Sequence, residues 1–166
     1  LYKHSGVYDD VICNDITWCV FSCFDVDGWK DVKPVPGKLN IATFHGSVLG
    51  STTDLDFALR GEVDLKFFEG FDFVLLGDIH KMQHLGHRCC RDGVERPWIS
   101  YCGSTIQQNY SETSEHGFLM WDIRSHDDFT VEFIAVDNPN KFVTIDWQGD
   151  IASTLKLVAA DTSNAR

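Results

Sequence analysis

The stretch F-D-F-V-L-L-G-D-I-H-K-M-Q, from Phe71 to Gln83, decides how the rest of the chain is interpreted. Its apolar run, Phe73 to Leu76, is rich in strand formers and predicts a buried strand that ends at Gly77. Asp78 and His80 follow at the carboxyl end of that strand, where α/β sheets place their functional sites. These two residue types suit metal binding or proton transfer. An exposed turn, with Asp78 capping backbone amides, is the alternative.

A second strand end with the same layout lies earlier in the chain. Leu39 to Phe44 (L-N-I-A-T-F) is a short apolar run that stops at His45 and a glycine, and Asp64 to Glu69 predicts a short helix between the two strands. Because neighbouring parallel strands end at one edge of a sheet, we expect His45, Asp78 and His80 to lie close together. Metal ligation is then a better hypothesis than separate hydrogen bonds.

The composition limits the classes of function. The chain has 166 residues, 43% of them hydrophobic, which is enough for the core of one domain or of part of one. A formal net charge of −11 argues against a broad basic surface for nucleic acid, although bound divalent cations would supply positive charge. No segment has the length of a membrane helix, and we expect a cytoplasmic protein. Since the chain starts at Leu1, we expect a fragment.

The remaining elements are predicted to be mainly strands, with no obvious strand before Val11. A hairpin turn is expected at Arg91 to Gly93, and the run from Gln148 to Arg166 is expected to be a linker or a truncated next domain. The predicted strands are Ile16 to Phe24, Trp98 to Cys102, Gly117 to Ile123, Thr130 to Val136 and Phe142 to Trp147, the last three as an antiparallel meander.

The cysteines and histidines allow a rival hypothesis of a structural zinc site. Five candidate ligands crowd into eleven positions, namely His80, His84, His87, Cys89 and Cys90. Strand alternation would place them on both faces, and no Cys-x2-Cys knuckle is present, so this hypothesis is the weaker one. We expect reduced and mostly buried thiols at the six cysteines, which are Cys13, Cys19, Cys23, Cys89, Cys90 and Cys102, with Cys19 and Cys23 on one core face.

Four motifs in order carry a family resemblance: F-H-G, G-D-I-H, Y-C-G-S-T-I-Q-Q-N-Y-S-E and H-G-F-L-M-W-D-I. Together they resemble the carboxyl half of the calcineurin-like metallophosphoesterases and, within them, the SbcD-type DNA repair nucleases, in a variant similar to phage and large-virus forms. If it is viral, the resemblance implies the nucleus or the cytoplasm of a virus-infected cell. The resemblance covers Leu39 to Trp147. It implies an α/β fold, a four-layer αββα sandwich of which this chain is a strand-rich carboxyl-terminal portion.

The resemblance also implies a site with two divalent metal ions. His45 would hold one metal together with Asp78, while His80 would reach the other, and the pair of ions would clamp a phosphodiester. We expect Mn²⁺, with Mg²⁺ or Fe²⁺ as alternatives. The chain departs from the family at Asp78, where a histidine is usual, and a carboxylate there favours harder ions.

The family's amino-terminal motifs have no match in this chain. The resemblance therefore places the remaining ligands and the proton donor upstream of Leu1, and we expect the 166 residues alone to be inactive. By the same resemblance, 1–125 would be the carboxyl half of the phosphoesterase domain, 126–147 would be terminal strands leading toward a cap domain, and 148–166 the linker.

The loop after Cys102 offers substrate-binding candidates. They are the hydrogen-bonding residues Ser104, Gln107, Gln108 and Asn109, which would touch a DNA backbone or organise the metal loops, unless the loop is merely capped at the surface. Glu112 and His116 match the family's acidic residue and the basic position before Gly-Phe, and there we expect a structural hydrogen bond rather than catalysis.

Three functions follow as hypotheses. The first is a DNA exonuclease or endonuclease of double-strand break repair or recombination, a homodimer in its full-length form, with DNA and an SbcC-type coiled-coil ATPase as partners by resemblance and no membrane. The second is a calcineurin-like hydrolase of nucleotides or phosphoproteins. The third is a non-catalytic binding module stabilised by one zinc.

Overall fold

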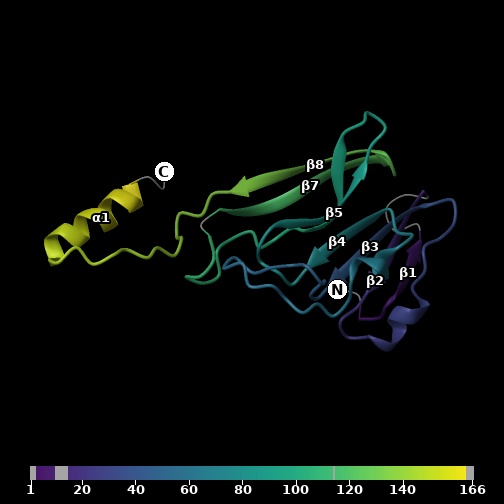
Figure 1. Cartoon of the computed structure of the whole chain (residues 1–166), viewed down its shortest axis with the longest axis horizontal. Coiled ribbons are helices and arrows are strands. Elements are labelled where there is room, and N and C mark those ends of the chain that lie inside the picture. Colours follow the sequence, from purple (N-terminus) through teal and green to yellow (C-terminus); the bar gives the residue numbers. More distant parts are fainter. Residues whose placement is uncertain (1–2, 10–14, 114, 164–166) are drawn as a thin grey trace.

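The structure, a computed structural model, describes residues 3–9, 15–113 and 115–163 of the chain. Its centre is a six-stranded mixed sheet in the order β1-β2-β3-β4-β6-β5 (Figure 1). The strands are β1 Gly6–Asp9, β2 Ile16–Phe21, β3 Leu39–His45, β4 Phe73–Gly77, β5 Gln83–Cys89 and β6 Glu95–Tyr101. Strands β2, β3, β4 and β6 run parallel, and β1 and β5 are antiparallel to their neighbours. The expected α/β class is confirmed.

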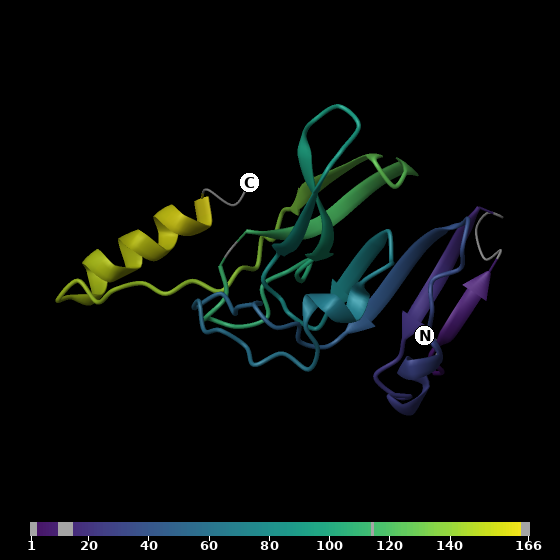
Figure 2. The ribbon, with the colours of Figure 1, turned by 45° about the vertical axis from the view of Figure 1, so that its right-hand side comes forward.

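A two-stranded antiparallel sheet covers part of one face of this sheet. It consists of β7 His116–Ser125 and β8 Asp128–Val136, joined by a tight turn at His126 and Asp127 (Figures 1 and 2). The ring of Phe73 on β4 packs against Phe129, at 4.7 Å between centroids, and against Trp121, at 5.9 Å. These aromatic contacts fasten the hairpin to the centre of the large sheet.

Two 3-10 helices and their loops cover the opposite face. They are η1 Asp27–Asp31 and η2 Leu65–Phe68, the second capped by the side chain of Asp64, which accepts hydrogen bonds from two backbone amides. Aromatic rings from these helices and from β2 and β3 form one cluster, with centroids 4.8 to 6.5 Å apart: Phe21, Trp29, Phe44, Phe67, Phe68 and Phe71. The predicted short helix at Asp64 to Glu69 is therefore present.

The sequence-based prediction fails at both ends of the chain. The strand β1 was not expected, whereas the predicted strand at Phe142 to Trp147 is absent, so the meander is a two-stranded hairpin. The expected linker contains the helix α1 Ile151–Ser163, which Figure 1 shows apart from both sheets. Its run has no glycine or proline, and Asp150 accepts a hydrogen bond from the Ser153 amide at 2.8 Å, which favours a helix start. Within the described ranges, no helix combines the length and apolarity that crossing a membrane requires.

The cysteines are less buried than predicted. Strand β2 ends at Phe21, so Cys19 lies in the core but Cys23 is exposed beyond the strand, which corrects the expectation of a shared core face. Cys89 and Cys102 are also exposed, Cys90 is buried, and all five are free thiols. Cys13 lies outside the described residues.

One buried tyrosine connects two strand ends. Tyr101, the last residue of β6, is 0% exposed, and its hydroxyl donates to the Gly46 carbonyl at 2.7 Å and accepts from the Val48 amide at 2.9 Å. The loop after β3 is thereby held against β6, across the intervening β4. Burial, the largest cause, raises the pKa of Tyr101, so the neutral hydroxyl that makes both bonds is favoured.

Removing this hydroxyl should destabilise the fold. In Tyr101→Phe the ring still fills the core, but the buried backbone groups of Gly46 and Val48 lose their partner, and we expect the free energy of unfolding to fall by about 1–3 kcal/mol. Urea unfolding measures it. Tyr110→Phe, at a tyrosine that is 70% exposed, is the matched control and should change stability little. Equal effects of the two variants would contradict the role of Tyr101.

Candidate functional site

The parallel register brings three strand ends to one edge of the sheet. His45 pairs with Gly77, so β3 and β4 end together as predicted, and Leu76 pairs with Tyr101, so β6 ends at the same edge. The contact at Gly77 is close, because a Cβ atom there would lie 3.1 Å from Cδ2 of the His45 ring. The loops that follow these strands, each with polar residues, therefore form a single surface.

The backbone at Asp78 is unusual. Its φ of 92° lies in a region that residues other than glycine rarely adopt, and its side chain is exposed directly after β4. Strain of this kind is retained where the surrounding structure fixes the turn, and it is concentrated at functional sites. The negative charge of Asp78 is one of the smaller causes, after burial, that act to raise the pKa of Tyr101.

His80 is oriented by a buried carboxylate. Its Nδ1 lies 2.8 Å from Oε1 of Glu112, whose side chain is 5% exposed, while that of His80 is 40% exposed. Because an ionised carboxylate only accepts hydrogen bonds, Nδ1 carries the proton. In the neutral ring, Nε2 then has the lone pair that binds a metal, which is the tautomer that a carboxylate behind a histidine ligand selects.

Glu112 is held by several donors. Oε2 accepts from the Gln108 amide at 2.7 Å, and Oε1 accepts from the Asn109 side chain at 2.6 Å. Burial raises the pKa of Glu112, but the hydrogen bonds from Gln108 and His80 and the charges of His80 and His116 outweigh it and lower the pKa. The expected structural hydrogen bond at Glu112 is therefore confirmed.

The other candidates in this loop also have partners inside the protein. Gln107 is buried, and it donates to the Glu112 carbonyl at 2.8 Å and accepts from the Phe142 amide at 2.8 Å. Ser104 donates to the Ile106 carbonyl at 2.9 Å, and its hydroxyl also lies 2.9 Å from Nδ1 of the buried His116. These bonds give the loop a defined shape, whereas contact of Ser104, Gln107, Gln108 or Asn109 with DNA stays a prediction.

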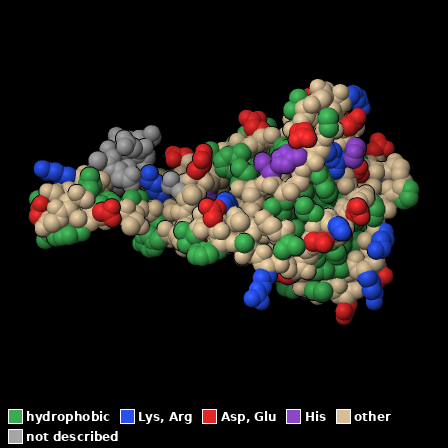
Figure 3. Space-filling view, in the orientation of Figure 1, with side chains coloured by type: hydrophobic (Ala, Val, Ile, Leu, Met, Phe, Trp, Pro, Cys, Tyr) green, Lys and Arg blue, Asp and Glu red, His purple; other side chains and the backbone are tan. Residues whose placement is uncertain are grey.

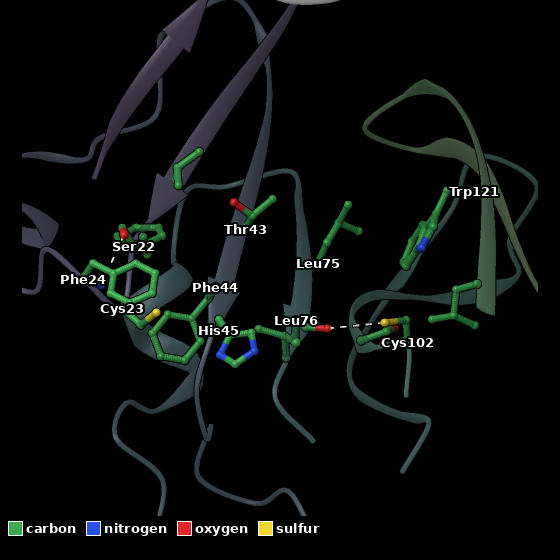
Figure 4. A pocket seen from close by; sticks show the side chains of 15 residues that line it. Ser22, Cys23, Phe24, Thr43, Phe44, His45, Leu75, Leu76, Cys102 and Trp121 are labelled. Atoms are coloured by element: carbon green, nitrogen blue, oxygen red, sulfur yellow. Dashed lines mark hydrogen bonds between the residues drawn. The ribbon is translucent and has the colours of Figure 1, made fainter. Parts of the chain in front are cut away.

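The three predicted metal ligands lie at the same edge but line two different hollows. Asp78 and His80 line a hollow of about 390 Å³ beside the loop that follows β3. His45 instead lines an apolar cavity of about 610 Å³ between the large sheet and β7. Figure 4 shows the His45 ring between Phe44 and Leu76, with Trp121 on the opposite side of the cavity. In the described part of the chain, no three His, Cys, Asp or Glu side chains are gathered for a metal ion.

The histidines of the zinc hypothesis are arranged differently from the prediction. A bulge at Gly86 breaks the strand alternation, and it brings the rings of His84 and His87 to 6.1 Å between centroids. Nδ1 of His84 lies 2.7 Å from the Ser100 hydroxyl. Strict alternation was therefore the wrong argument against zinc, although the residues described offer no third ligand beside this pair.

Sequence reasoning missed two residues that shape the edge. Tyr101 lies within the quoted Y-C-G-S motif, yet nothing in its spacing indicates that its hydroxyl spans two strands. Gln83, at the end of the opening stretch, accepts from the Thr52 amide at 2.9 Å and donates to the Thr52 carbonyl at 2.9 Å. Both act through long-range contacts that no local pattern reveals.

Comparison with known proteins gives one informative result. No model of a known protein family matches the chain. The chain is similar to an uncharacterized protein of Acanthamoeba polyphaga mimivirus, with 34% identity over 155 residues, which covers 86% of this chain and 10% of the viral protein. The chain thus spans about a tenth of the length of the curated relative that it matches.

Replacing the buried carboxylate should destabilise the loop and release His80. We expect Glu112→Gln to lower the free energy of unfolding by about 1–3 kcal/mol, because the backbone and side-chain donors around it lose a charged acceptor. Urea unfolding tests this. The exposed neighbour Glu115 offers the control Glu115→Gln, for which a change below about 0.5 kcal/mol is expected. A Glu112→Gln protein as stable as the Glu115→Gln protein would refute the assignment.

The histidine pair on β5 predicts acid sensitivity. Burial, followed by the charge of His87, lowers the pKa of His84 from its ordinary value of 6.5. As the pH falls below that value the unfolded state takes up the proton first, so native stability is lost from there down through the lowered folded pKa. His84→Gln should therefore lose less unfolding free energy than the unmodified chain between about pH 7.5 and about pH 5.5. Parallel losses in the two proteins would count against this explanation.

Proposed function

We propose that this segment is part of a two-metal phosphodiesterase that hydrolyses DNA, in a calcineurin-like metallophosphoesterase of the SbcD type. The observation that carries the proposal is the pairing of His80 with the buried Glu112, which sets the imidazole for metal binding at the same sheet edge as Asp78 and His45. The ordered motifs support it, and the viral relative accords with the viral variant that they resemble.

The residues of this chain supply part of a ligand set. His45, Asp78 and His80 would hold the metals, with Mn²⁺ expected and Mg²⁺ or Fe²⁺ as alternatives, and the other ligands would come from elsewhere in a longer protein. When bound, two such ions lower the pKa of a water molecule and stabilise the in-line transition state. The need for cations is physical: the net charge is −11, and Figure 3 shows Lys and Arg side chains dispersed over the visible face rather than gathered.

The four-layer αββα sandwich is part of the same proposal. In a four-layer sandwich, β7 and β8 would be the edge of a second sheet, and further strands would pair beside β7 and cover the apolar cavity below it. The cavity is consistent with this, because its walls include Leu75 of the large sheet and Leu119 and Trp121 of β7 (Figure 4). A two-stranded sheet is too small to cover six strands.

The partners are likewise proposals. DNA is the substrate, and a coiled-coil ATPase of the SbcC type and a second copy of the nuclease complete the assembly by family resemblance. The similar viral protein is about ten times the length of the matched region, so a single chain of that kind has room for an ATPase as well as a nuclease domain.

Metal binding tests the proposal directly. The 166-residue chain should bind Mn²⁺ weakly, as measured by the loss of the free-ion signal in electron paramagnetic resonance. His45→Ala and His80→Ala should each reduce that binding about 10-fold or more, because each removes a ligand. The chain alone should show no manganese-dependent cleavage of DNA.

The control is a histidine in the turn between β7 and β8, near the amino end of β4 and therefore away from the proposed metal site. His126 contacts Asp72, which precedes β4, and His126→Ala should leave Mn²⁺ binding unchanged. The zinc-module alternative, which the close approach of His84 and His87 favours, makes a different prediction: one zinc retained with purified protein and lost when Cys89 and Cys90 are replaced. Zinc retention of this kind, together with Mn²⁺ binding that His80→Ala does not change, would overturn the nuclease proposal.

A further inference from the structure

We infer that the hollow beside Asp78 and His80 is a subsite for an unpaired nucleobase, and that Phe57 is the ring on which the base stacks. The inference rests on the proposed function in one respect: the base would belong to the DNA strand whose phosphate lies at the metal edge. It concerns the 48–63 loop, which follows β3 and for which neither the motifs nor the comparison assigns a role.

The 48–63 loop is built as a rigid element. Its base is closed by a bridge between Val48 and Val63, and its tip is closed by a second bridge between Thr52 and Ala58. Gln83 clamps the tip by binding both the amide and the carbonyl of Thr52, as described above. The loop therefore presents its tip in a fixed position, with little conformational freedom left to lose when a ligand binds.

The tip exposes apolar side chains toward the hollow. Phe57 is 67% exposed, and Leu55 is 59% exposed, although both lie on a loop whose backbone is well fastened. Together with Leu59 they line one wall of the hollow. An aromatic ring that stays in water does not gain the free energy of burial. A ligand that covers the Phe57 ring would supply that free energy, which gives a physical reason for the exposed position.

The hollow matches a nucleotide in size and polarity. Its volume of about 390 Å³ lies in the range of small-molecule sites, and its lining combines the apolar side chains of the loop with a polar wall formed by Asp78, His80 and Lys81. A base has an apolar face and a polar edge, and aromatic side chains bind single-stranded nucleic acid by stacking on that face. The polar wall lies at the metal edge, where the attached phosphate would be.

The charged residues that line the hollow favour an uncharged base over a free phosphate as the ligand. Lys81 is the cation of the lining, and its Nζ is held by Asp56 at 2.6 Å and by the Thr52 hydroxyl at 3.1 Å. Three further carboxylates line the hollow: Asp54, Asp78 and Glu112. An anion would meet repulsion there, whereas an uncharged ring would not.

The test measures binding of a fluorescently labelled ten-nucleotide oligothymidylate to the 166-residue chain by anisotropy, in low salt with Mn²⁺. An abasic strand with the same phosphates serves as the second probe. We expect the chain to bind the oligothymidylate more tightly than the abasic strand. Phe57→Ala should weaken binding of the first about 10-fold and leave binding of the second unchanged, and Phe57→Trp should retain the affinity.

The matched control is Phe24, which is 70% exposed in the segment after β2 and does not line this hollow. Phe24→Ala should bind both strands as the unmodified chain does. No detectable binding, equal affinity for the two strands, or equal weakening of both by Phe57→Ala would overturn the subsite. If instead the Phe57 effect is found but Mn²⁺ binding does not depend on His80, the nucleobase subsite stands and the proposed phosphodiesterase fails.

Discussion

Parallel pairing of β3, β4 and β6 is the constraint on which the rest of this structure depends. Strands that run the same way end at the same edge, so the loops after His45, Gly77 and Tyr101 must share one surface. The Tyr101 hydroxyl strengthens the arrangement, since it satisfies the backbone groups of Gly46 and Val48 two strands away. Without that register, Asp78 and His80 would be ordinary turn residues.

The chemistry of this edge follows from a buried carboxylate, Glu112, whose hydrogen-bond donors and neighbouring imidazoles outweigh the cost of burying its charge. Glu112 is buried and surrounded by amide and imidazole donors, so it stays ionised and orients His80. Asp78 remains exposed on a strained backbone. With a net charge of −11, the chain would need bound cations to hold an anionic substrate of the proposed kind.

The two faces of the large sheet are covered unequally. One face is packed with aromatic rings from η1, η2 and the loops beside them, whereas the other has a smaller buried cluster, in which Phe73 meets Phe129 and Trp121 of the hairpin. The remaining cavity of about 610 Å³ lies below β7 and borders His45. Through His45, this apolar cavity borders the sheet edge at which metal binding is proposed.

Local features could be predicted from the amino-acid sequence, because strand propensity and turn chemistry depend on neighbours in the chain. They are the apolar runs of β2, β3, β4 and β6, the turn at Arg91 to Gly93, and the polar residues that follow each strand. Prediction from the sequence failed for β1 and α1, and for Phe142 to Trp147, where an apolar run formed no strand. Which histidines lie close together could not be predicted in this way, since the bulge at Gly86 and the register of β3 with β4 depend on pairing between strands. The same holds for the clamp of Gln83 on the 48–63 loop and for the exposed position of Phe57, which arise from contacts across some 30 residues of chain.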